Sequence, residues 1–239
     1  MIHYHGMAGT QLDNTARLAE GRHIFVSHAA CTALPLISSV CSTFALDNGA
    51  YSLWSKGKQV DYEKYMDFVD QWHRHPSFDW ACIPDVIDGS EDENDMWLDR
   101  WPDRLPGVPV WHLHESLERL DRLVNNYRVV ALGSSGEYER PGSTGWWRRM
   151  GEAMEVACDE EGKPKTKLHG LRMLDTRIFT RLPLSSADST NAERNGLFER
   201  SYLPHTSGQR AVVIAWRVES SQSAEVWEPS PQMELDLAI

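Results

Sequence analysis

Cysteine and long apolar runs are both scarce in this chain of 239 residues. The four cysteines lie far apart and form no Cys-x-x-Cys pair; they are Cys31, Cys41, Cys82 and Cys158. This spacing argues against a disulfide framework and against a thiolate zinc site. No segment approaches the ~20 consecutive apolar residues of a membrane helix, and the chain does not begin with a basic stretch followed by an apolar one. We therefore expect a soluble, non-secreted protein with reduced thiols in the cytoplasm.

Positive charge is also scarce. The chain has 24 Lys and Arg and 35 Asp and Glu, which gives a formal net charge of -11. A uniform acidic excess would argue against nucleic acid, since phosphate binding depends on Lys and Arg. Residues 165–217, however, hold nine basic and four acidic residues, a local balance of +5. Two interpretations remain open, a basic face on an acidic body and a scattered solvated surface.

Short apolar segments, each followed by a helical or loop segment, recur along the chain. Eight strands are predicted, at residues 2–5, 23–28, 43–47, 79–84, 108–112, 128–132, 167–173 and 182–188. Apolar stripes at helical spacing predict helices that begin near Asp61, Ser116 and Ser143 or Thr144. Alternating strands and helices favour a parallel sheet, and eight such units close a barrel. We predict an α/β fold, a single (β/α)8 TIM-like barrel over residues 1–218, with an acidic, partly disordered Ser- and Pro-containing tail over residues 219–239.

Acidic residues follow three of these strands, and in a parallel barrel the carboxyl ends of the strands build the site. Asp47, Asp85 and Asp188 stand at these ends, and Asp188 is the predicted centre. On a period-two strand Leu184, Ser186 and Asp188 share one face. Taken alone, the sequence Asp-Asn-Gly at 47–49 is typical of an Asx turn. Three converging carboxylates are harder to explain as turns, because they repel unless a ligand, proton or metal compensates them.

Paired carboxylates suit cleavage of a bond to a sugar anomeric carbon. One attacks C1′ as charge develops on the ring, while the other handles protons on the base. A third carboxylate can accept two hydrogen bonds from a guanine-like base, and backbone N–H groups of residues 133–136 can donate to the carbonyl oxygen of that base. The Gly-Ser-Ser-Gly sequence at 133–136 is equally typical of an ordinary strand-to-helix turn.

Five short motifs lie between residues 43 and 196: Asp-Asn-Gly-Ala (47–50), Pro-Asp (84–85), Ala-Leu-Gly-Ser (131–134), Leu-His-Gly (168–170) and Ser-Ala-Asp-Ser (186–189). Together they resemble the tRNA-guanine transglycosylases, and more closely their DNA-acting relatives, which insert 7-deazaguanines into phage and bacterial DNA. The most specific pairing is Leu-His-Gly followed by Ser-Ala-Asp-Ser.

The resemblance implies a DNA-guanine transglycosylase that exchanges guanine in DNA for a 7-deazaguanine such as preQ0, with no cofactor or metal, through a covalent aspartyl-glycosyl intermediate. It implies that Asp188 is the nucleophile and Asp47 the acid/base, while Asp85 and Gly133 recognise the base. The remaining predicted substrate-binding residues are Asn48, Gly49, His112, His114, Ser134 and Arg172. The predicted nucleic-acid-binding residues are Arg177, Arg181 and Arg194.

Two features depart from the tRNA enzymes. No cysteine follows Cys158, so the Cys-rich zinc motif that follows their barrel is missing, which weakens a tRNA substrate. Near the end of strand five, where those enzymes use Gln, this chain has Trp-His-Leu-His at 111–114. The group that contacts the base from this strand is therefore open.

Three alternatives remain. A tRNA-guanine transglycosylase-like enzyme would share the carboxylates. A metal-dependent barrel hydrolase would use two His-x-His pairs with a strand-end acid, namely His3, His5, His112, His114 and Asp188. A non-catalytic module would hold nucleic acid on Trp-rich segments and on residues 165–217, although converging acids oppose phosphate binding.

The chain ends in Pro-Gln-Met-Glu-Leu-Asp-Leu-Ala-Ile at 231–239. Gln232 followed by spaced Leu residues resembles the short peptides that dock bacterial sliding clamps, which makes a clamp a candidate partner. An apolar end that folds back on the barrel is the favoured alternative.

Overall fold

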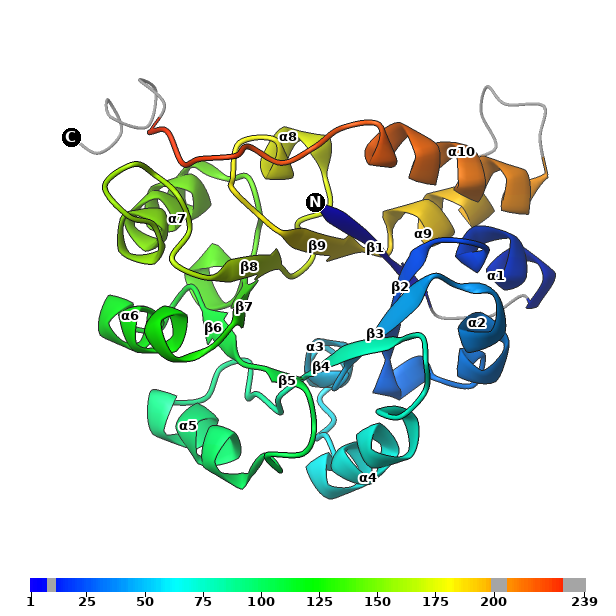
Figure 1. Ribbon diagram of the computed structural model, residues 1–239, viewed down its shortest axis with the longest axis horizontal. Helices are drawn as coiled ribbons and strands as arrows, with labels where there is room; N and C mark the ends of the chain where they lie inside the picture. Colours follow the sequence, from blue (N-terminus) through cyan, green and yellow to red (C-terminus); the bar gives the residue numbers. More distant parts are fainter. Residues whose placement is uncertain (8–11, 199–205, 230–239) are drawn as a thin grey trace.

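The computed structural model describes residues 1–7, 12–198 and 206–229. All paired strands are parallel and form one sheet, in the order β5-β4-β3-β2-β1-β9-β8-β7-β6 (Figure 1). The strands are β1 (Ile2–Met7), β2 (His23–Ser27), β3 (Thr43–Asp47), β4 (Phe78–Cys82), β5 (Gly107–Val108), β6 (Val110–His112), β7 (Val129–Gly133), β8 (Lys167–Gly170) and β9 (Ser186–Ser189). The predicted clamp-binding sequence lies outside the described residues.

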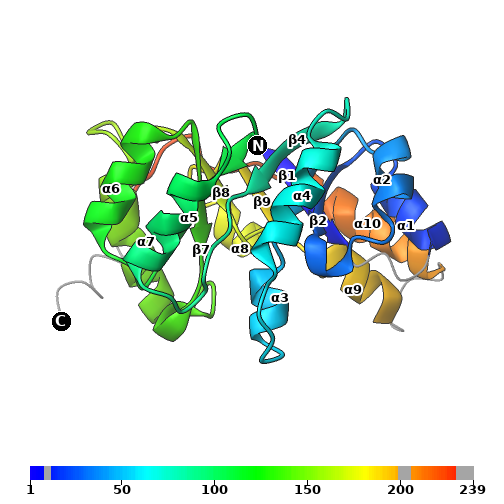
Figure 2. The same cartoon turned by 90° about the horizontal axis from the view of Figure 1, so that it is seen from below.

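Most helices surround the sheet on its outer side, whereas the one at Ala50–Trp54 projects from one end of the barrel (Figures 1 and 2). They are α1 (Leu12–Ala19), α2 (Leu34–Val40), α3 (Ala50–Trp54), α4 (Tyr62–Trp72), α5 (Glu91–Arg100), α6 (Leu117–Asn126), α7 (Thr144–Ala157), α8 (Thr176–Phe179), α9 (Asn191–Phe198) and α10 (Ser207–Glu219), with short 3-10 helices η1 (His28–Ala30) and η2 (Gly136–Tyr138). Within the described ranges, none of these helices combines the length and apolar character needed to cross a bilayer.

Three predicted helix starts are confirmed by side-chain caps. Asp61, Ser116 and Ser143 each accept a hydrogen bond from the backbone N–H three residues further on. Such caps satisfy one of the N–H groups that the first turn of a helix leaves without an intrahelical partner.

Pro109 divides the fifth barrel strand into β5 and β6. It lacks an N–H group and therefore cannot donate to a ladder. On one side Gly107 and Val108 pair with β4, and on the other Val110 begins the pairing with β7. The Pro109 carbonyl still accepts from Ala131 N at 2.9 Å. Nine segments thus fill eight strand positions, and the predicted TIM-like barrel is confirmed as a nearly closed one.

The hydrophobic core has an inner and an outer part. One cluster fills the barrel interior with Tyr4, Phe25, Ala45, Trp80, Cys82, Val108, Val110 and Ala131. Two larger clusters lie between the strands and the surrounding helices. This division follows from the period of two along a strand, which points successive side chains to opposite faces of the barrel wall.

The two strands predicted at residues 167–173 and 182–188 are each three residues shorter in the structure. β8 ends at Gly170, so Arg172 lies in the following turn rather than on the strand. β9 begins at Ser186, and Leu184 precedes it and packs in an outer cluster with α7. The prediction that Leu184 shares a strand face with Ser186 and Asp188 is therefore wrong for Leu184.

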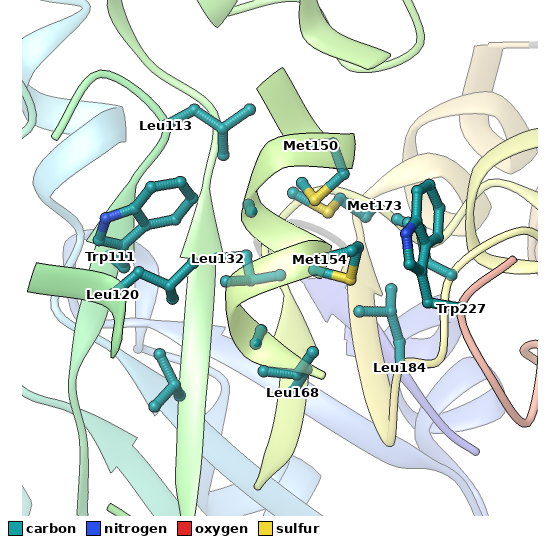
Figure 3. Close-up of a cluster of buried hydrophobic side chains, with 14 of the residues drawn as sticks. Trp111, Leu113, Leu120, Leu132, Met150, Met154, Leu168, Met173, Leu184 and Trp227 are labelled. Carbon is teal, nitrogen blue, oxygen red and sulfur yellow. The ribbon is translucent and has the colours of Figure 1, made fainter. Parts of the chain in front are cut away.

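The described part of the tail packs on the barrel. His3 Nε2 lies 2.9 Å from the Ser221 carbonyl, and Glu219 Oε1 lies 2.9 Å from His5 Nε2 and forms an ion pair with Arg22. Further on, Trp227 lies beside Met154, Met173 and Leu184 in an outer cluster (Figure 3). Residues 219–229 are thus part of the folded body.

We predict that Trp227→Ala lowers the free energy of unfolding by about 3–5 kcal/mol, because it leaves a cavity in this cluster. Trp227 is 7% exposed, and its indole N–H has no partner among the described residues. Trp227→Phe should therefore cost much less. Urea titration of both variants, with Trp216→Ala as the control at a 62% exposed position, measures the difference. Equal stability of wild type and Trp227→Ala would mean that residues 219–229 are dispensable for folding.

Candidate active site

A cavity of about 530 Å³ opens at the end of the barrel where the strands finish. Asp47, Asp85 and Asp188 all line it, which brings together the three predicted acids from three separate parts of the chain. Further lining residues from the predicted set are Asn48, His112, Gly133, Ser134, Arg172 and Arg194. Apolar side chains, among them Phe25, Cys82 and Ile87, complete the wall. The size and the mixture of apolar walls with a few polar groups are typical of a small-molecule site.

Four predicted residues do not line this cavity. Gly49 has a left-handed φ of 82°, and a Cβ there would come within 3.0 Å of Ala29, so its role is conformational. His114 is exposed and its Nδ1 lies 2.7 Å from the Ser135 hydroxyl. Arg177 and Arg181 are also exposed.

Charge partners divide the three predicted nucleic-acid-binding arginines. Arg177 forms an ion pair with Asp175 at 2.6 Å, and Arg181 lies over the Trp147 ring at 5.3 Å. Arg194, at the start of α9, is exposed and lines the cavity. Of the three, Arg194 is thus best placed to meet a charged ligand at the cavity.

Asp85 is buried and held from two sides. His112 Nε2 lies 2.8 Å from Asp85 Oδ2, and Asn48 Nδ2 donates to Asp85 Oδ1 at 2.6 Å. Asn48 also donates to the Ile83 carbonyl and accepts from Ala50 N, so it forms the Asx turn itself. Asn48 therefore positions Asp85 and the start of α3.

His112 rests on a buried polar network. Its backbone N–H donates to Glu115 Oε2, which also accepts from the Arg119 guanidinium at 2.7 Å. Asn94 donates to the other Glu115 oxygen at 2.8 Å. Both Glu115 and Arg119 are buried, where a charge is stable only when it is paired and hydrogen-bonded. The network therefore fixes the end of β6 and the histidine it carries.

The second His112 nitrogen, Nδ1, has no hydrogen-bond partner within the described parts of the chain. A Cβ built on Gly133 would lie 2.8 Å from this atom. Only glycine fits at 133 without displacing His112, so Gly133 supports the site through its lack of a side chain.

Asp188 is oriented by two groups from β8 and the following turn. Its Oδ1 accepts from Arg172 N at 2.9 Å and lies 3.4 Å from His169 Nε2. The His169 contact is within ion-pair range but does not have hydrogen-bond geometry, since Nε2 has no bonded partner in the described chain. Among the described residues both contacts fall on Oδ1, so the opposite oxygen, Oδ2, is the one left for a ligand.

Arg172 connects three of the loops around the cavity. Besides its N–H bond to Asp188, its guanidinium donates to the Ser134 carbonyl and lies over the Tyr51 ring at 3.8 Å. Its φ of 59° is the only positive value at a non-glycine residue in the described ranges. Such strained backbone persists only when the surroundings hold it, and it is frequent at functional sites.

Burial raises the pKa of Asp47 from 3.8 to about 7. The negative charges of Asp85 and Asp188 also raise this pKa, while the Ser27 hydroxyl and the Gly49 N–H lower it. The side chain lies deep in the protein yet remains partly exposed to the cavity. At neutral pH this carboxyl can therefore hold a proton or release it, as a general acid/base must.

The ligand set of the metal-hydrolase alternative is not brought together. His3 and His5 contact Ser221 and Glu219 and do not line the cavity. In the described chain no cluster of three His, Cys, Asp or Glu side chains has a geometry suited to a metal ion.

His169 and the network behind His112 are not among the predicted site residues. His169 is fully buried among the rings of Tyr4, Phe25 and Trp80, and its Nδ1 lies 2.8 Å from the Ser186 hydroxyl. The signal for it was the histidine in Leu-His-Gly, since a polar residue inside an apolar strand needs a partner.

No protein-family model matches this chain, and no curated protein matches it.

The raised pKa of Asp47 predicts a pH-dependent stability. Between pH 3.8 and about 7 the unfolded chain has released the Asp47 proton and the folded protein keeps it. The folded state binds more protons, so stability falls as pH rises through this window and stays low above it. The upper bound is about 4 kcal/mol, at 1.36 kcal/mol per pH unit, and solvent in the cavity reduces it.

Asp47→Asn should remove this loss. Its free energy of unfolding relative to wild type should rise from about pH 4.5 to about pH 8, as measured by urea titration. Asp85→Asn, which removes the stronger of the two charge repulsions on Asp47, should shift the pH range of this stability loss to lower pH. If the difference in free energy of unfolding between Asp47→Asn and wild type is constant with pH, the pKa of Asp47 is not raised.

Proposed function

We propose that the protein is a base-exchanging transglycosylase that replaces guanine in DNA with a 7-deazaguanine such as preQ0. The observation that carries the proposal is the convergence of Asp47, Asp85 and Asp188 in one cavity, each with a different set of partners. Three carboxylates in three environments are suited to three roles: attack, proton transfer and base recognition.

Asp188 is the proposed nucleophile. Its Oδ2 attacks C1′ of the target nucleotide and forms a glycosyl ester as the bond from C1′ to N9 of guanine breaks. The electron pair of that bond goes to the base, which takes the proton of Asp47 and leaves as neutral guanine. In the second half of the reaction, the incoming deazaguanine gives its N9 proton to Asp47. Its N9 then attacks C1′, and the ester bond to Asp188 breaks.

Asp85 is the proposed base-recognition group. A carboxylate offers about four lone-pair sites, and contacts with His112 and Asn48 occupy two of them. The two that remain match the N1–H and exocyclic NH2 donors on one edge of guanine. Because both partners hold the carboxylate in one orientation, little conformational entropy is lost when the base binds.

DNA is the proposed substrate because the five motifs between residues 43 and 196 resemble those of the DNA-acting enzymes more closely than those of the tRNA enzymes. Arg172 and Arg194 add positive charge to the cavity lining. A strand-end cavity cannot reach a base inside a duplex, so the target nucleotide must flip out or be single-stranded.

A trapping experiment tests the two catalytic roles. Wild-type protein incubated with a DNA oligonucleotide and a deazaguanine that completes exchange poorly should give a denaturant-resistant protein–DNA adduct, visible as a shifted band on a denaturing gel. Asp188→Asn keeps the shape but loses the nucleophilic anion, so the adduct should be absent. Asp47→Asn should still form some adduct but turn over more slowly.

Parallel incubations of DNA and tRNA with labelled guanine identify the polymer. Label in DNA supports the proposal, and label in tRNA alone refutes the DNA assignment. An adduct that persists in Asp188→Asn and vanishes in Asp47→Asn would mean that the two roles are reversed. Full exchange activity in both variants would place the chemistry outside this cavity.

Asp85 should decide which base is accepted. The wild type should exchange labelled guanine at least ~100-fold faster than hypoxanthine, which lacks the exocyclic amine, because a buried acceptor left unpaired is costly. In Asp85→Asn guanine exchange should fall and this preference should shrink, with thermal unfolding unchanged within a few degrees. A preserved preference in that variant would remove Asp85 from base recognition.

A further inference from the structure

Helix α3 and its flanking residues form an arm that projects from the barrel (Figure 2). The arm comprises residues 48–60, Asn-Gly-Ala-Tyr-Ser-Leu-Trp-Ser-Lys-Gly-Lys-Gln-Val. It contains two lysines and no acidic residue, in a chain whose net charge is -11. Charge of this sign at one projecting element favours contact with an anionic partner.

The base of the arm belongs to the cavity. Ala50, Tyr51 and Ser52 all line it. Asn48 fixes the first turn of α3 through Ala50 N, and Arg172 lies over the Tyr51 ring. The arm thus leaves the barrel directly beside the proposed catalytic carboxylates.

The outer part of the arm presents an aromatic side chain followed by two basic ones. Trp54 is 40% exposed, and its ring lies 5.9 Å from that of Tyr51, which is 37% exposed. Lys56 and Lys58 are exposed on either side of Gly57, which turns with a φ of 65°. Two neighbouring exposed aromatic rings, those of Tyr51 and Trp54, thus lie beside two exposed lysines, and this combination is typical of surfaces that bind single-stranded nucleic acid.

We propose that this arm binds the DNA strand that flanks the target nucleotide. In this complex Trp54 stacks on a neighbouring base, and Lys56 and Lys58 contact phosphates of the same strand. The inference rests on the proposed function, since it names the groups that hold the substrate at the same cavity. Aromatic rings stack on any base, and neighbouring lysines contact the phosphate backbone of the DNA. Such a surface therefore binds single-stranded or unstacked DNA without sequence specificity.

The arm also accounts for how a flipped base is kept outside the stack. When a nucleotide enters the cavity, its neighbours lose a stacking partner, and an aromatic or apolar side chain from the protein replaces it in many DNA-bending proteins. Of the two exposed aromatic side chains on the arm, Tyr51 lines the cavity and Trp54 lies outside it. Trp54 is therefore the one placed to contact a neighbouring base.

Fluorescence anisotropy with a fluorescein-labelled single-stranded DNA of about 12 nucleotides, a length within the usual site sizes, tests the arm. Trp54→Ala should bind this DNA about 5- to 100-fold more weakly than wild type, given typical stacking energies. Trp216→Ala is the matched control, because Trp216 is more exposed but lies on α10, away from the cavity. It should bind as wild type does.

Salt dependence separates charge from stacking. In the Lys56→Gln, Lys58→Gln double variant the slope of log affinity against log salt should become shallower by about 1.4, or ~0.7 for each phosphate contact to a single strand. Trp54→Ala should leave that slope unchanged. The same protein samples are assayed for exchange of labelled guanine into the oligonucleotide, and binding is repeated with RNA of the same sequence.

Each result decides one of the two proposals. Guanine exchange by wild type, with equal DNA binding by wild type and Trp54→Ala, overturns the role of the arm and leaves the transglycosylase standing. DNA binding that Trp54→Ala weakens, without any exchange by wild type, upholds the arm and overturns the transglycosylase. No DNA binding by wild type overturns both, and tighter, Trp54-dependent binding of RNA overturns the choice of DNA.

Discussion

Electrostatic repulsion among Asp47, Asp85 and Asp188 is the constraint around which the rest of this structure is arranged. Three carboxylates in one cavity cannot all remain ionised without compensation. Each meets this constraint differently: Asp85 lies against the His112 ring, Asp188 accepts a backbone N–H, and the pKa of Asp47 is raised to about 7. The site therefore holds like groups in unlike protonation environments, which is a requirement for acid/base chemistry at neutral pH.

The surroundings of the cavity serve to keep these groups in place. On one side, the buried ion pair between Glu115 and Arg119 anchors the backbone of His112 and with it Asp85. On the other side, the strained turn at Arg172 directs one N–H to Asp188 and the guanidinium to the Ser134 carbonyl. A buried charge left without its partner is strongly destabilising, so substitution of Glu115 or Arg119 alone should be costly.

The arm over residues 48–60 is coupled to the carboxylates of the cavity through shared contacts. One amide, Asn48, both orients Asp85 and begins α3, so the position of Tyr51 and Trp54 is coupled to the base-recognition carboxylate. Arg172 couples Tyr51 to Asp188 in the same way. Substrate held on the arm would thus be in register with the reacting groups, and positioning of this kind supplies a large share of catalytic power in general.

The sequence by itself determined the barrel and the membership of the acid cluster. Alternating apolar segments and helix caps are local patterns, so the eight strand positions and the caps at Asp61, Ser116 and Ser143 were predictable. The rule that parallel strands end on one face of a barrel then predicted that Asp47, Asp85 and Asp188 would meet.

Tertiary structure alone decided the partners of those acids. His112 contacts Asp85, His169 approaches Asp188, and Arg172 stacks on Tyr51. These contacts join residues 19 to 121 positions apart, which no local pattern encodes. The division of the fifth strand at Pro109 and the packing of Trp227 depend equally on neighbours distant in the chain. Propensity and periodicity act over a few residues, whereas burial, and with it the pKa of Asp47, arises only when the whole barrel has closed.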